Sequence, residues 1–147
     1  MIKEFLTVLL VEDNPDDVEL TLHALKKNNI ANPIEVVRDG QEAIDYLFYT
    51  GKYSNSKHRL PGVILLDLKL PKVDGIEILR RIKEDSKLKM IPVVVLTSSK
   101  EERDIVDAYN LGVNSYIRKP VDFDQFTETV RTIRYYWLLI NEHPIIR

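Results

Sequence analysis

Short apolar runs recur along the chain, and each of them stops abruptly at a polar residue. The run from Val63 to Leu66 is typical, because its consecutive aliphatic side chains end at the carboxylate of Asp67. A run that is apolar at every position, rather than at alternate positions, indicates a strand buried on both faces of a parallel sheet. Similar, largely apolar runs predict strands over residues 7–11, 93–96 and 115–118 as well as 63–66, and residues 34–37 are predicted to form a further strand.

The segments between these runs have helical patterns. Apolar residues recur in them at spacings of three and four, and helix-start residues precede them, most clearly Asn14 followed by Pro15. The predicted helices include residues 15–27, 43–48, 76–86, 101–110 and 123–140. Alternation of strand and helix is typical of a parallel sheet with helices on both faces, because each crossover is right-handed and about one helix long. The predicted fold class is a three-layer α/β sandwich.

Residues suited to phosphate and metal chemistry follow four of the predicted strands. Glu12 and Asp13 follow the first strand, Asp67 the third, Thr97 the fourth and Lys119 the fifth. In a parallel sheet the carboxyl ends of the strands lie at one edge, which is where open α/β proteins bind their ligands. We therefore expect these side chains to meet at a single site.

The acidic members of this group predict a divalent-cation site. Two carboxylates about 4 Å apart repel each other by roughly 4 kcal/mol at an effective dielectric of about 20, so Glu12, Asp13 and Asp67 stay ionised together only around a cation. Oxygen ligands without cysteine or paired histidines select a hard ion, and Mg²⁺ fits this set. A carboxylate oxygen of Asp67 is then able to attack a phosphoryl group, with Lys119 and Thr97 contacting phosphoryl oxygens.

Composition narrows the class of protein. The chain has 147 residues, of which 44% are hydrophobic and 30% charged, with a net charge of −2 and no cysteine. These values predict a single globular domain over residues 1–147, too short for a second module. The N-terminal segment is interpreted as a core strand rather than a signal peptide, so the expected location is the cytoplasm. The net negative charge does not favour binding to nucleic acid or to a lipid surface. The N-terminal apolar run is too short to span a membrane. The lack of cysteine excludes disulfides and thiolate metal sites.

One segment lacks any periodic pattern. Residues 50–59 are polar and are predicted to form a loop with exposed turns, either a tolerated surface insertion or a contact for a partner. Tyr46 and Tyr49, in the preceding helix, lie off its apolar stripe. His23 has no partner histidine or cysteine at ligand spacing, so we expect it on a helix surface.

Aromatic residues distinguish the last two predicted helices. In the fourth predicted helix, Tyr109 is expected to face the core. In the last helix, Tyr135, Tyr136 and Trp137 are consecutive and therefore point all round the axis, so one sheet face cannot cover them. Exposed aromatics at this density favour an interface, and we expect a homodimer. Its predicted interface consists of residues 101–110, residues 115–118 and the last helix.

Together, these motifs resemble the receiver domain of two-component response regulators. The resemblance covers roughly residues 5–130, and it depends on the strand-end residues and on four dipeptides. These dipeptides are Leu70-Pro71, Asp74-Gly75, Thr97-Ser98 and Lys119-Pro120. The resemblance implies a flavodoxin-like sheet with strand order 2-1-3-4-5. It also implies a cis peptide bond before Pro120.

The resemblance assigns roles to the site residues. Asp67 is implied to receive a phosphoryl group from a histidine kinase. Mg²⁺ is implied to be held by Asp13, by Asp67 and by the main-chain carbonyl of Lys69, with Glu12 acting through water. Lys69 stands where the family frequently has Asn, but only its backbone is required for the metal. Its side chain is expected to affect dephosphorylation or the choice of kinase.

The resemblance further implies a switch and a class of partner. Phosphorylation is implied to draw the hydroxyl of Thr97 toward the phosphoryl group and to turn the ring of Tyr116 inward, which changes a protein-contact face. The output is then contact with a downstream protein or onward phosphotransfer. Within the family, the long segment before the third strand and the extended last helix resemble the single-domain response regulators of cyanobacterial and bacterial phytochromes. A phytochrome-type kinase is therefore the expected phosphoryl donor.

Three other functions fit parts of the sequence. A Mg²⁺-dependent phosphohydrolase of the haloacid dehalogenase kind also uses an Asp after a strand, but it needs a second Asp where this chain has Lys69. A receiver-like interaction module that no longer accepts phosphate is disfavoured, because every residue required for the chemistry is present. A flavodoxin-type cofactor site would need a phosphate-binding loop after the first strand, and Glu12 and Asp13 would repel phosphate there.

Overall fold

The described part of the chain folds around one parallel β-sheet. A computed structural model of the protein describes residues 7–27, 32–97, 102–113, 115–118 and 128. The sheet has five strands in the order β2-β1-β3-β4-β5, as predicted. Its strands are β1 (Val8–Val11), β2 (Ile34–Val37), β3 (Val63–Leu66), β4 (Val93–Thr97) and β5 (Ser115–Arg118).

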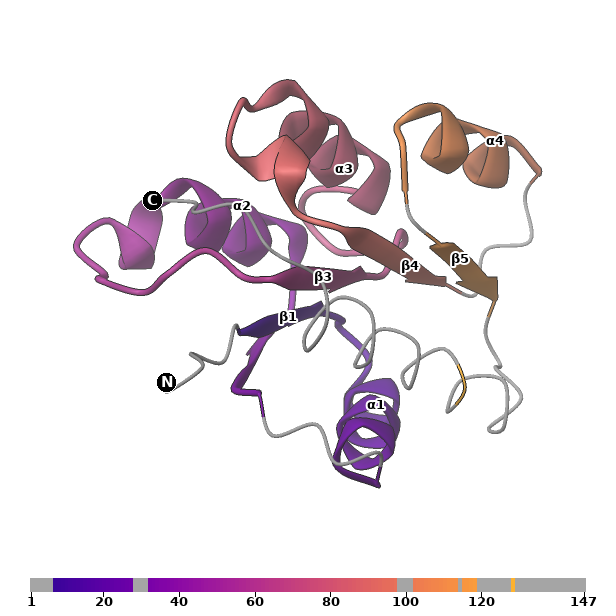
Figure 1. The fold of residues 1–147 in the computed structure, drawn as a ribbon, viewed down its shortest axis with the longest axis horizontal. Helices are drawn as coiled ribbons and strands as arrows, with labels where there is room; N and C mark the ends of the chain where they lie inside the picture. Colours follow the sequence, from indigo (N-terminus) through magenta and orange to yellow (C-terminus); the bar gives the residue numbers. More distant parts are fainter. Residues whose placement is uncertain (1–6, 28–31, 98–101, 114, 119–127, 129–147) are drawn as a thin grey trace, which may run out of the picture.

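Helices cover both faces of this sheet, so the sandwich has three layers (Figure 1). The described helices are α1 (Pro15–Lys27), α2 (Gly40–Phe48), α3 (Gly75–Glu84) and α4 (Glu102–Asn110), with short 3-10 helices at Gly51–Tyr53 and Leu88–Met90. The helices α2, α3 and α4 lie on one face, and α1 lies on the other (Figure 1). The predicted last helix lies outside the described residues, apart from Glu128 in a helical conformation.

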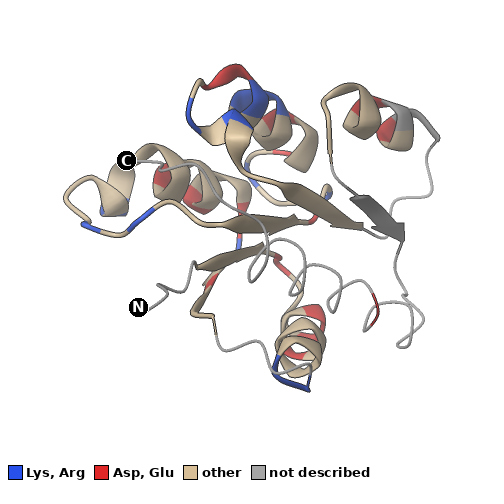
Figure 2. Ribbon diagram, in the orientation of Figure 1, with Lys and Arg blue, Asp and Glu red and all other residues tan. Residues whose placement is uncertain are grey.

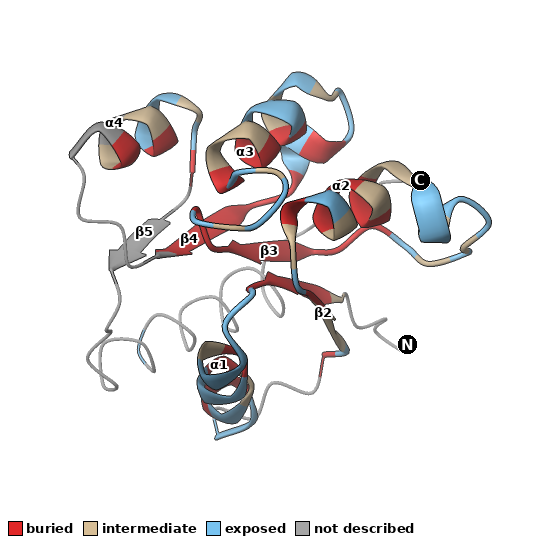
Figure 3. Cartoon of the chain, turned by 180° about the vertical axis from the view of Figure 1, so that it is seen from behind, coloured by how far each residue is buried: buried red, intermediate tan, exposed pale blue. Residues whose placement is uncertain are grey.

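Side-chain alternation along the strands divides the interior into two cores. In β1, Leu9 and Val11 pack on the side of α2, α3 and α4, whereas Val8 and Leu10 pack on the side of α1. The central strands are therefore buried throughout, and the exposed residues lie on the outer faces of the helices and in the connections (Figure 3). Charged residues have the same distribution and are absent from β1 and β3 (Figure 2). Continuous apolar runs were the correct signal for these strands.

The helix starts follow from the capping residues. The side-chain oxygen of Asn14 accepts hydrogen bonds from the main-chain N–H groups of Asp16 and Asp17, at 2.9 and 3.2 Å. Asp39 caps α2 by accepting from the N–H of Glu42 at 2.7 Å, and this bond lowers the pKa of the Asp39 carboxyl below its ordinary value of 3.8. These bonds satisfy amide groups that have no partner within a helix.

The two Asp-Gly pairs of the sequence have a second role besides capping. Gly40 and Gly75 are the first residues of α2 and α3. A Cβ atom on Gly40 would lie 2.6 Å from the carbonyl carbon of Val73, and one on Gly75 would lie 2.5 Å from the carbonyl oxygen of Asp67. Real Cβ atoms do not approach backbone this closely, so glycine is required for both helix starts to pack against the segment that follows β3.

Residues 50–59 form exposed turns, as predicted, and His58 anchors this segment to α2. The ring of His58 is stacked between those of Tyr46 and Tyr49, with centroid distances of 4.0 and 4.4 Å. The hydroxyl of Tyr49 donates to the carbonyl oxygen of His58 at 2.6 Å, and Nε2 of His58 lies 2.8 Å from the carbonyl oxygen of Tyr46. Tyr46, which the sequence placed off the apolar stripe of its helix, is therefore buried, and burial raises the pKa of its hydroxyl to about 12. The predicted turns are present in this segment, but they are anchored to α2.

Two further expectations about individual residues have opposite outcomes. Tyr109 was expected to face the core, but its side chain is 54% exposed, while its neighbour Ala108 is fully buried. The short helix α4 therefore presents a narrower apolar stripe than its sequence indicated. His23 is exposed on α1, as expected. Among the residues that the structure describes, no helix has the length and apolar character needed to cross a membrane.

Candidate phosphoacceptor and metal site

The sheet register brings the acidic residues together. Val11, the last residue of β1, is paired with Leu66, the last residue of β3. The residues that follow, Glu12 and Asp67, therefore leave the sheet side by side at its carboxyl edge. The main-chain N–H of Asp67 donates to the carbonyl of Val11 at 3.0 Å, and that of Glu12 donates to Val37 of the other neighbouring strand at 3.0 Å. Both residues are thus fixed by the sheet itself.

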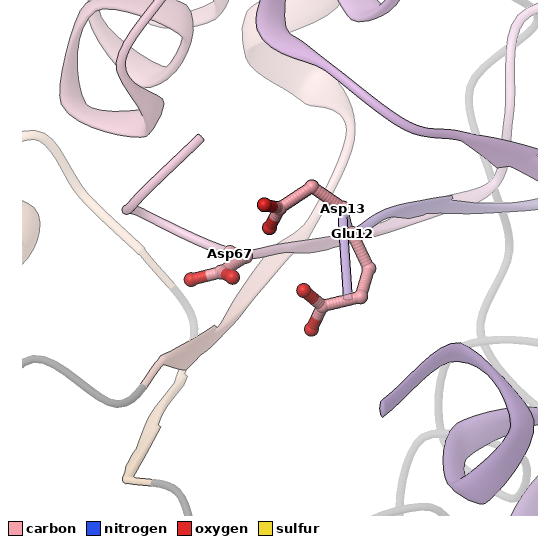
Figure 4. Close-up of side chains that lie close together, drawn as sticks. All are labelled: Glu12, Asp13 and Asp67. Carbon is pink, nitrogen blue, oxygen red and sulfur yellow. The ribbon is translucent and has the colours of Figure 1, made fainter. Parts of the chain in front are cut away.

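Three carboxylates meet at this edge. One oxygen each from Glu12, Asp13 and Asp67 lie within 4.8 Å of one another. Figure 4 shows the three side chains gathered around a common space at the ends of their strands. Glu12 and Asp67 are buried, at 2% and 6% exposure, whereas Asp13 is exposed. The cluster is therefore open to solvent on the side of Asp13.

Main-chain groups orient two of these carboxylates. The N–H of Asn14 donates to Oε2 of Glu12 at 3.3 Å, and the N–H of Lys69 donates to Oδ1 of Asp67 at 3.2 Å. The segment after β3 is held in turn by the N–H of Gly75, which donates to the carbonyl of Leu68 at 2.8 Å. The position of the Asp67 carboxylate therefore depends on the start of α3 as well as on the end of β3.

The donor set fits a hard divalent cation. All of its side-chain ligands are carboxylate oxygens, and their mutual repulsion at this spacing amounts to roughly 4 kcal/mol per pair at an effective dielectric of about 20. Magnesium and manganese prefer such oxygen ligands and retain water on their remaining positions. The arrangement is therefore suited to bind a metal ion beside the Asp67 carboxylate, with Glu12 and Asp13 as its neighbours.

The structure describes the other predicted site residues in part. Thr97 is the last residue of β4. Val95, two positions earlier, is paired with Leu66 at the end of β3, so the backbone of Thr97 lies toward the carboxyl edge of the sheet. Tyr116 lies in β5, paired with Val95. The predicted residues that lie outside the described part of the chain are Lys119, Pro120, Tyr135, Tyr136 and Trp137. The predicted cis peptide bond before Pro120 and the last-helix aromatics therefore stay predictions.

One residue near the site was not found from the sequence. Asp104, in the first turn of α4, is buried at 8% exposure, and its Oδ2 lies 3.2 Å from Nζ of Lys69. The sequence shows only an acidic residue near a helix start, which is common on helix surfaces because it complements the helix dipole. The ion pair of Asp104 with Lys69 depends on how α4 packs against the rest of the protein, and this packing cannot be predicted from a local sequence pattern.

The family of the chain follows from comparison with known sequences. Residues 8–131 match the response regulator receiver domain family. The chain belongs to this family. A receiver is a phosphoacceptor signalling protein rather than an enzyme in the usual sense, and the acidic cluster of this receiver lies at the edge where the family resemblance had located it.

The chain is similar to several known proteins and solved structures. It is 44% identical over 137 residues to a probable methanogenesis regulatory protein, FilR2, of Methanothrix harundinacea, covering 93% of this chain and 86% of that protein. It is 43% identical to the phosphorylated cyanobacterial phytochrome response regulator RcpA, with a TM-score of 0.84 over 97% of this chain and 100% of that one. It is 41% identical to a Mn²⁺-bound form of response regulator Rcp1, with a TM-score of 0.82 over 95% and 99% of the two chains.

Proposed function

We propose that this receiver accepts a phosphoryl group on Asp67 from a histidine kinase, with a Mg²⁺ ion bound beside it. The observation that supports this most directly is the approach of Glu12, Asp13 and Asp67 oxygens to within 4.8 Å of one another at the carboxyl edge of the sheet. Glu12 and Asp67 are both buried and each accepts a main-chain hydrogen bond on one oxygen, so the choice of Asp67 as the acceptor rests on its place after β3, where the receiver family carries its phosphoacceptor. Its second oxygen is the proposed nucleophile.

The proposed step is an in-line phosphoryl transfer. An Asp67 carboxylate oxygen forms a bond to phosphorus while the bond from phosphorus to the donor breaks, and the donor leaves with the electron pair of that bond. With a kinase, the donor is a phosphohistidine, and the released imidazole takes up a proton from solvent. The product on Asp67 is a mixed anhydride of carboxylate and phosphate. Atoms and charge balance without any redox partner.

The proposed metal ligands are Asp13, Asp67 and the main-chain carbonyl of Lys69, with Glu12 acting through water. These groups supply oxygen ligands only, which suits Mg²⁺. The crystal structure of Rcp1 with Mn²⁺ supports a divalent ion in a related receiver. When bound, the ion supplies charge neutralisation for the phosphoryl oxygens. Asp13 would hold it, and Glu12 would act through water, from the segment after β1, and Asp67 would contribute from the position after β3.

Three further residues complete the proposal. Thr97 and Lys119 are proposed to contact phosphoryl oxygens through a hydroxyl and an ammonium group, and Tyr116 to turn inward when Thr97 does so. The backbone positions of Thr97 and Tyr116, at the end of β4 and in β5, are compatible with these roles. The output proposed for this change is altered contact with a downstream protein or onward phosphotransfer.

The intact mass of the protein tests the phosphoacceptor assignment. Incubation with acetyl phosphate and Mg²⁺ is expected to add one phosphoryl group to the wild-type chain and none to Asp67→Asn, because the amide is not a nucleophile for this step. Asp16→Asn, which removes an exposed carboxylate on α1, is the matched control and is expected to gain the same mass as wild type. A gain that survives Asp67→Asn would refute the acceptor, and no gain in wild type would refute the chemistry.

A second arm of the same assay tests the proposed kinase class. RcpA is named a phytochrome response regulator, and we propose a phytochrome-type histidine kinase as the donor for this receiver. At equal concentrations, transfer from such a kinase is expected to be at least tenfold faster than transfer from a histidine kinase of another class. Equal rates would contradict this partner assignment while leaving Asp67 as the acceptor.

We also propose that the receiver forms a homodimer through α4, β5 and the last helix. The exposed ring of Tyr109 on α4 is one apolar contribution to this surface among the described residues, and the sequence adds Tyr135, Tyr136 and Trp137. Light scattering at micromolar concentration is expected to give the mass of two chains, with or without a phosphoryl donor. A monomer in both conditions would contradict the dimer.

A further inference from the structure

Lys69 contacts two carboxylates through two different groups. Its main-chain N–H donates to Oδ1 of Asp67 at 3.2 Å, and its Nζ lies 3.2 Å from Oδ2 of Asp104. Asp67 is the proposed phosphoacceptor, and Asp104 is in the first turn of α4. A single residue therefore links the acidic cluster to a helix that is far from it in sequence.

The two partners in this ion pair differ in burial. The side chain of Asp104 is 12% exposed, whereas that of Lys69 is 49% exposed. The carboxylate is thus fixed by its helix in a place where a nearby cation offsets the cost of burial. The ammonium group reaches it from the solvent side on a four-carbon stem with three rotatable donors. Lys69 is therefore the partner that is able to move.

Phosphorylation of Asp67 would change which partner Lys69 favours. A phosphoryl group brings additional negative charge and further oxygen acceptors to the residue whose carboxylate already accepts from the Lys69 main chain. Charge-assisted bonds to phosphate compete directly with the bond to Asp104. A ligand shifts a two-state element only if it contacts the two states differently, and the Lys69 ammonium group provides such a difference.

We propose that Lys69 is a positioning residue that secures the first turn of α4 through Asp104 while Asp67 is unmodified, and that its ammonium group transfers to the phosphoryl group after phosphorylation. Asp104 then loses this cation, and the start of α4 becomes less stable. This inference rests on the proposed function, because it requires a phosphoryl group on Asp67. It assigns the side chain of Lys69 a role that is independent of its carbonyl group.

Hydrogen exchange of the full chain, read by mass spectrometry on peptides that cover α4, tests this role. In wild type, acetyl phosphate with saturating Mg²⁺ is expected to speed exchange of the α4 amides that follow its first turn by about threefold, which is within the range of a partly exposed ion pair. The amides of the first turn have no acceptor within the helix and do not report its stability. In Lys69→Ala, exchange is expected to be about threefold faster before phosphorylation and to change little afterwards. The backbone carbonyl of residue 69 is retained in this variant.

A matched control and a charge swap separate this role from general destabilisation. Lys52→Ala removes the lysine of another partly exposed ion pair, with Glu42 on α2, and is expected to respond to phosphorylation as wild type does. The double variant Lys69→Asp with Asp104→Lys is expected to restore slow exchange in the unmodified protein. It should remain unresponsive to phosphorylation, because position 69 no longer carries a cation.

The outcomes also distinguish this inference from the proposed function. If Lys69→Ala exchanges as slowly as wild type before phosphorylation, or accelerates by the same factor after it, the positioning role is overturned. If the wild-type protein gains no phosphoryl mass, the proposed function fails instead. In that case the comparison of unmodified wild type, Lys69→Ala and the charge swap still decides whether the ion pair holds α4.

Discussion

Asp13→Asn is expected to weaken Mg²⁺ binding by about 100-fold. The variant keeps an oxygen ligand but removes one negative charge from the cluster with Glu12 and Asp67. Coulomb's law at an effective dielectric near 20 gives an attraction of several kcal/mol between a carboxylate and a divalent ion. The amide oxygen of the asparagine side chain in the variant replaces part of this attraction. A remainder of about 2.7 kcal/mol corresponds to the 100-fold loss. Isothermal titration calorimetry or a magnesium-dependent melting shift measures it.

The same variant has the opposite effect when the metal is removed. In the presence of a chelator, Asp13→Asn is expected to have a higher free energy of unfolding than wild type, because it relieves repulsion among the three carboxylates. With saturating Mg²⁺ the order is expected to reverse, since a ligand stabilises the folded state by RT ln(1 + [L]/Kd) and the variant has the higher Kd. Asp16→Asn should show neither effect. Equal Mg²⁺ affinities for Asp13→Asn and wild type would contradict the metal site.

Gly75→Ala is expected to lower the free energy of unfolding by about 3 kcal/mol, at the upper end of the cost of overpacking a close-packed site. The added Cβ would lie 2.5 Å from the carbonyl oxygen of Asp67 and closer still to Cα of Leu68. Both are backbone atoms, so the start of α3 or the segment after β3 must shift. Because that segment contains the Asp67 carboxylate, phosphorylation by acetyl phosphate is expected to slow at least tenfold. Urea denaturation and the rate of mass gain measure the two effects.

Intrinsic helix propensity predicts the opposite sign for this substitution, which makes the test sharp. Alanine within a helix is favoured over glycine by about 1 kcal/mol, so a neutral or stabilised Gly75→Ala would show that the close approach is absent. Gly112→Ala provides the control, because that residue has a positive φ of 82° and its added Cβ would meet, among the described residues, only Cε of Lys83, at 3.9 Å. It is expected to cost about 1 kcal/mol through backbone strain and to leave phosphorylation unchanged.

The strands and the acidic cluster could be predicted because their signals are local and repeated. The central strands β1 and β3 are continuous apolar runs, and parallel pairing then brings the residue after each run to the same edge. Glu12 and Asp67 are adjacent for this reason alone, since their preceding residues Val11 and Leu66 are paired in register. The capping role of Asn14 was equally readable, because it acts on amides two and three residues away.

The features that the sequence did not reveal depend on contacts between distant residues. His58 packs between Tyr46 and Tyr49, so the order of residues 50–59 comes from ring stacking across nine to twelve positions, which has no periodic signature. The exposure of Tyr109 likewise depends on where the short helix α4 lies against the sheet. Such placements are set by tertiary packing, which overrides the local pattern.

Gly40 and Gly75 let the starts of α2 and α3 pack against the segment after β3. This packing affects how the protein could acquire specificity for a new phosphoryl donor. Because that segment is already held by backbone contacts, the proposed acceptor carboxylate of Asp67 requires little ordering when a donor docks. Discrimination between donors can then come from the outer helix surfaces, in addition to the side chain of Lys69. Those surfaces are free to diverge by substitution, so the chain could be redirected to another sensor while its reactive centre stays unchanged.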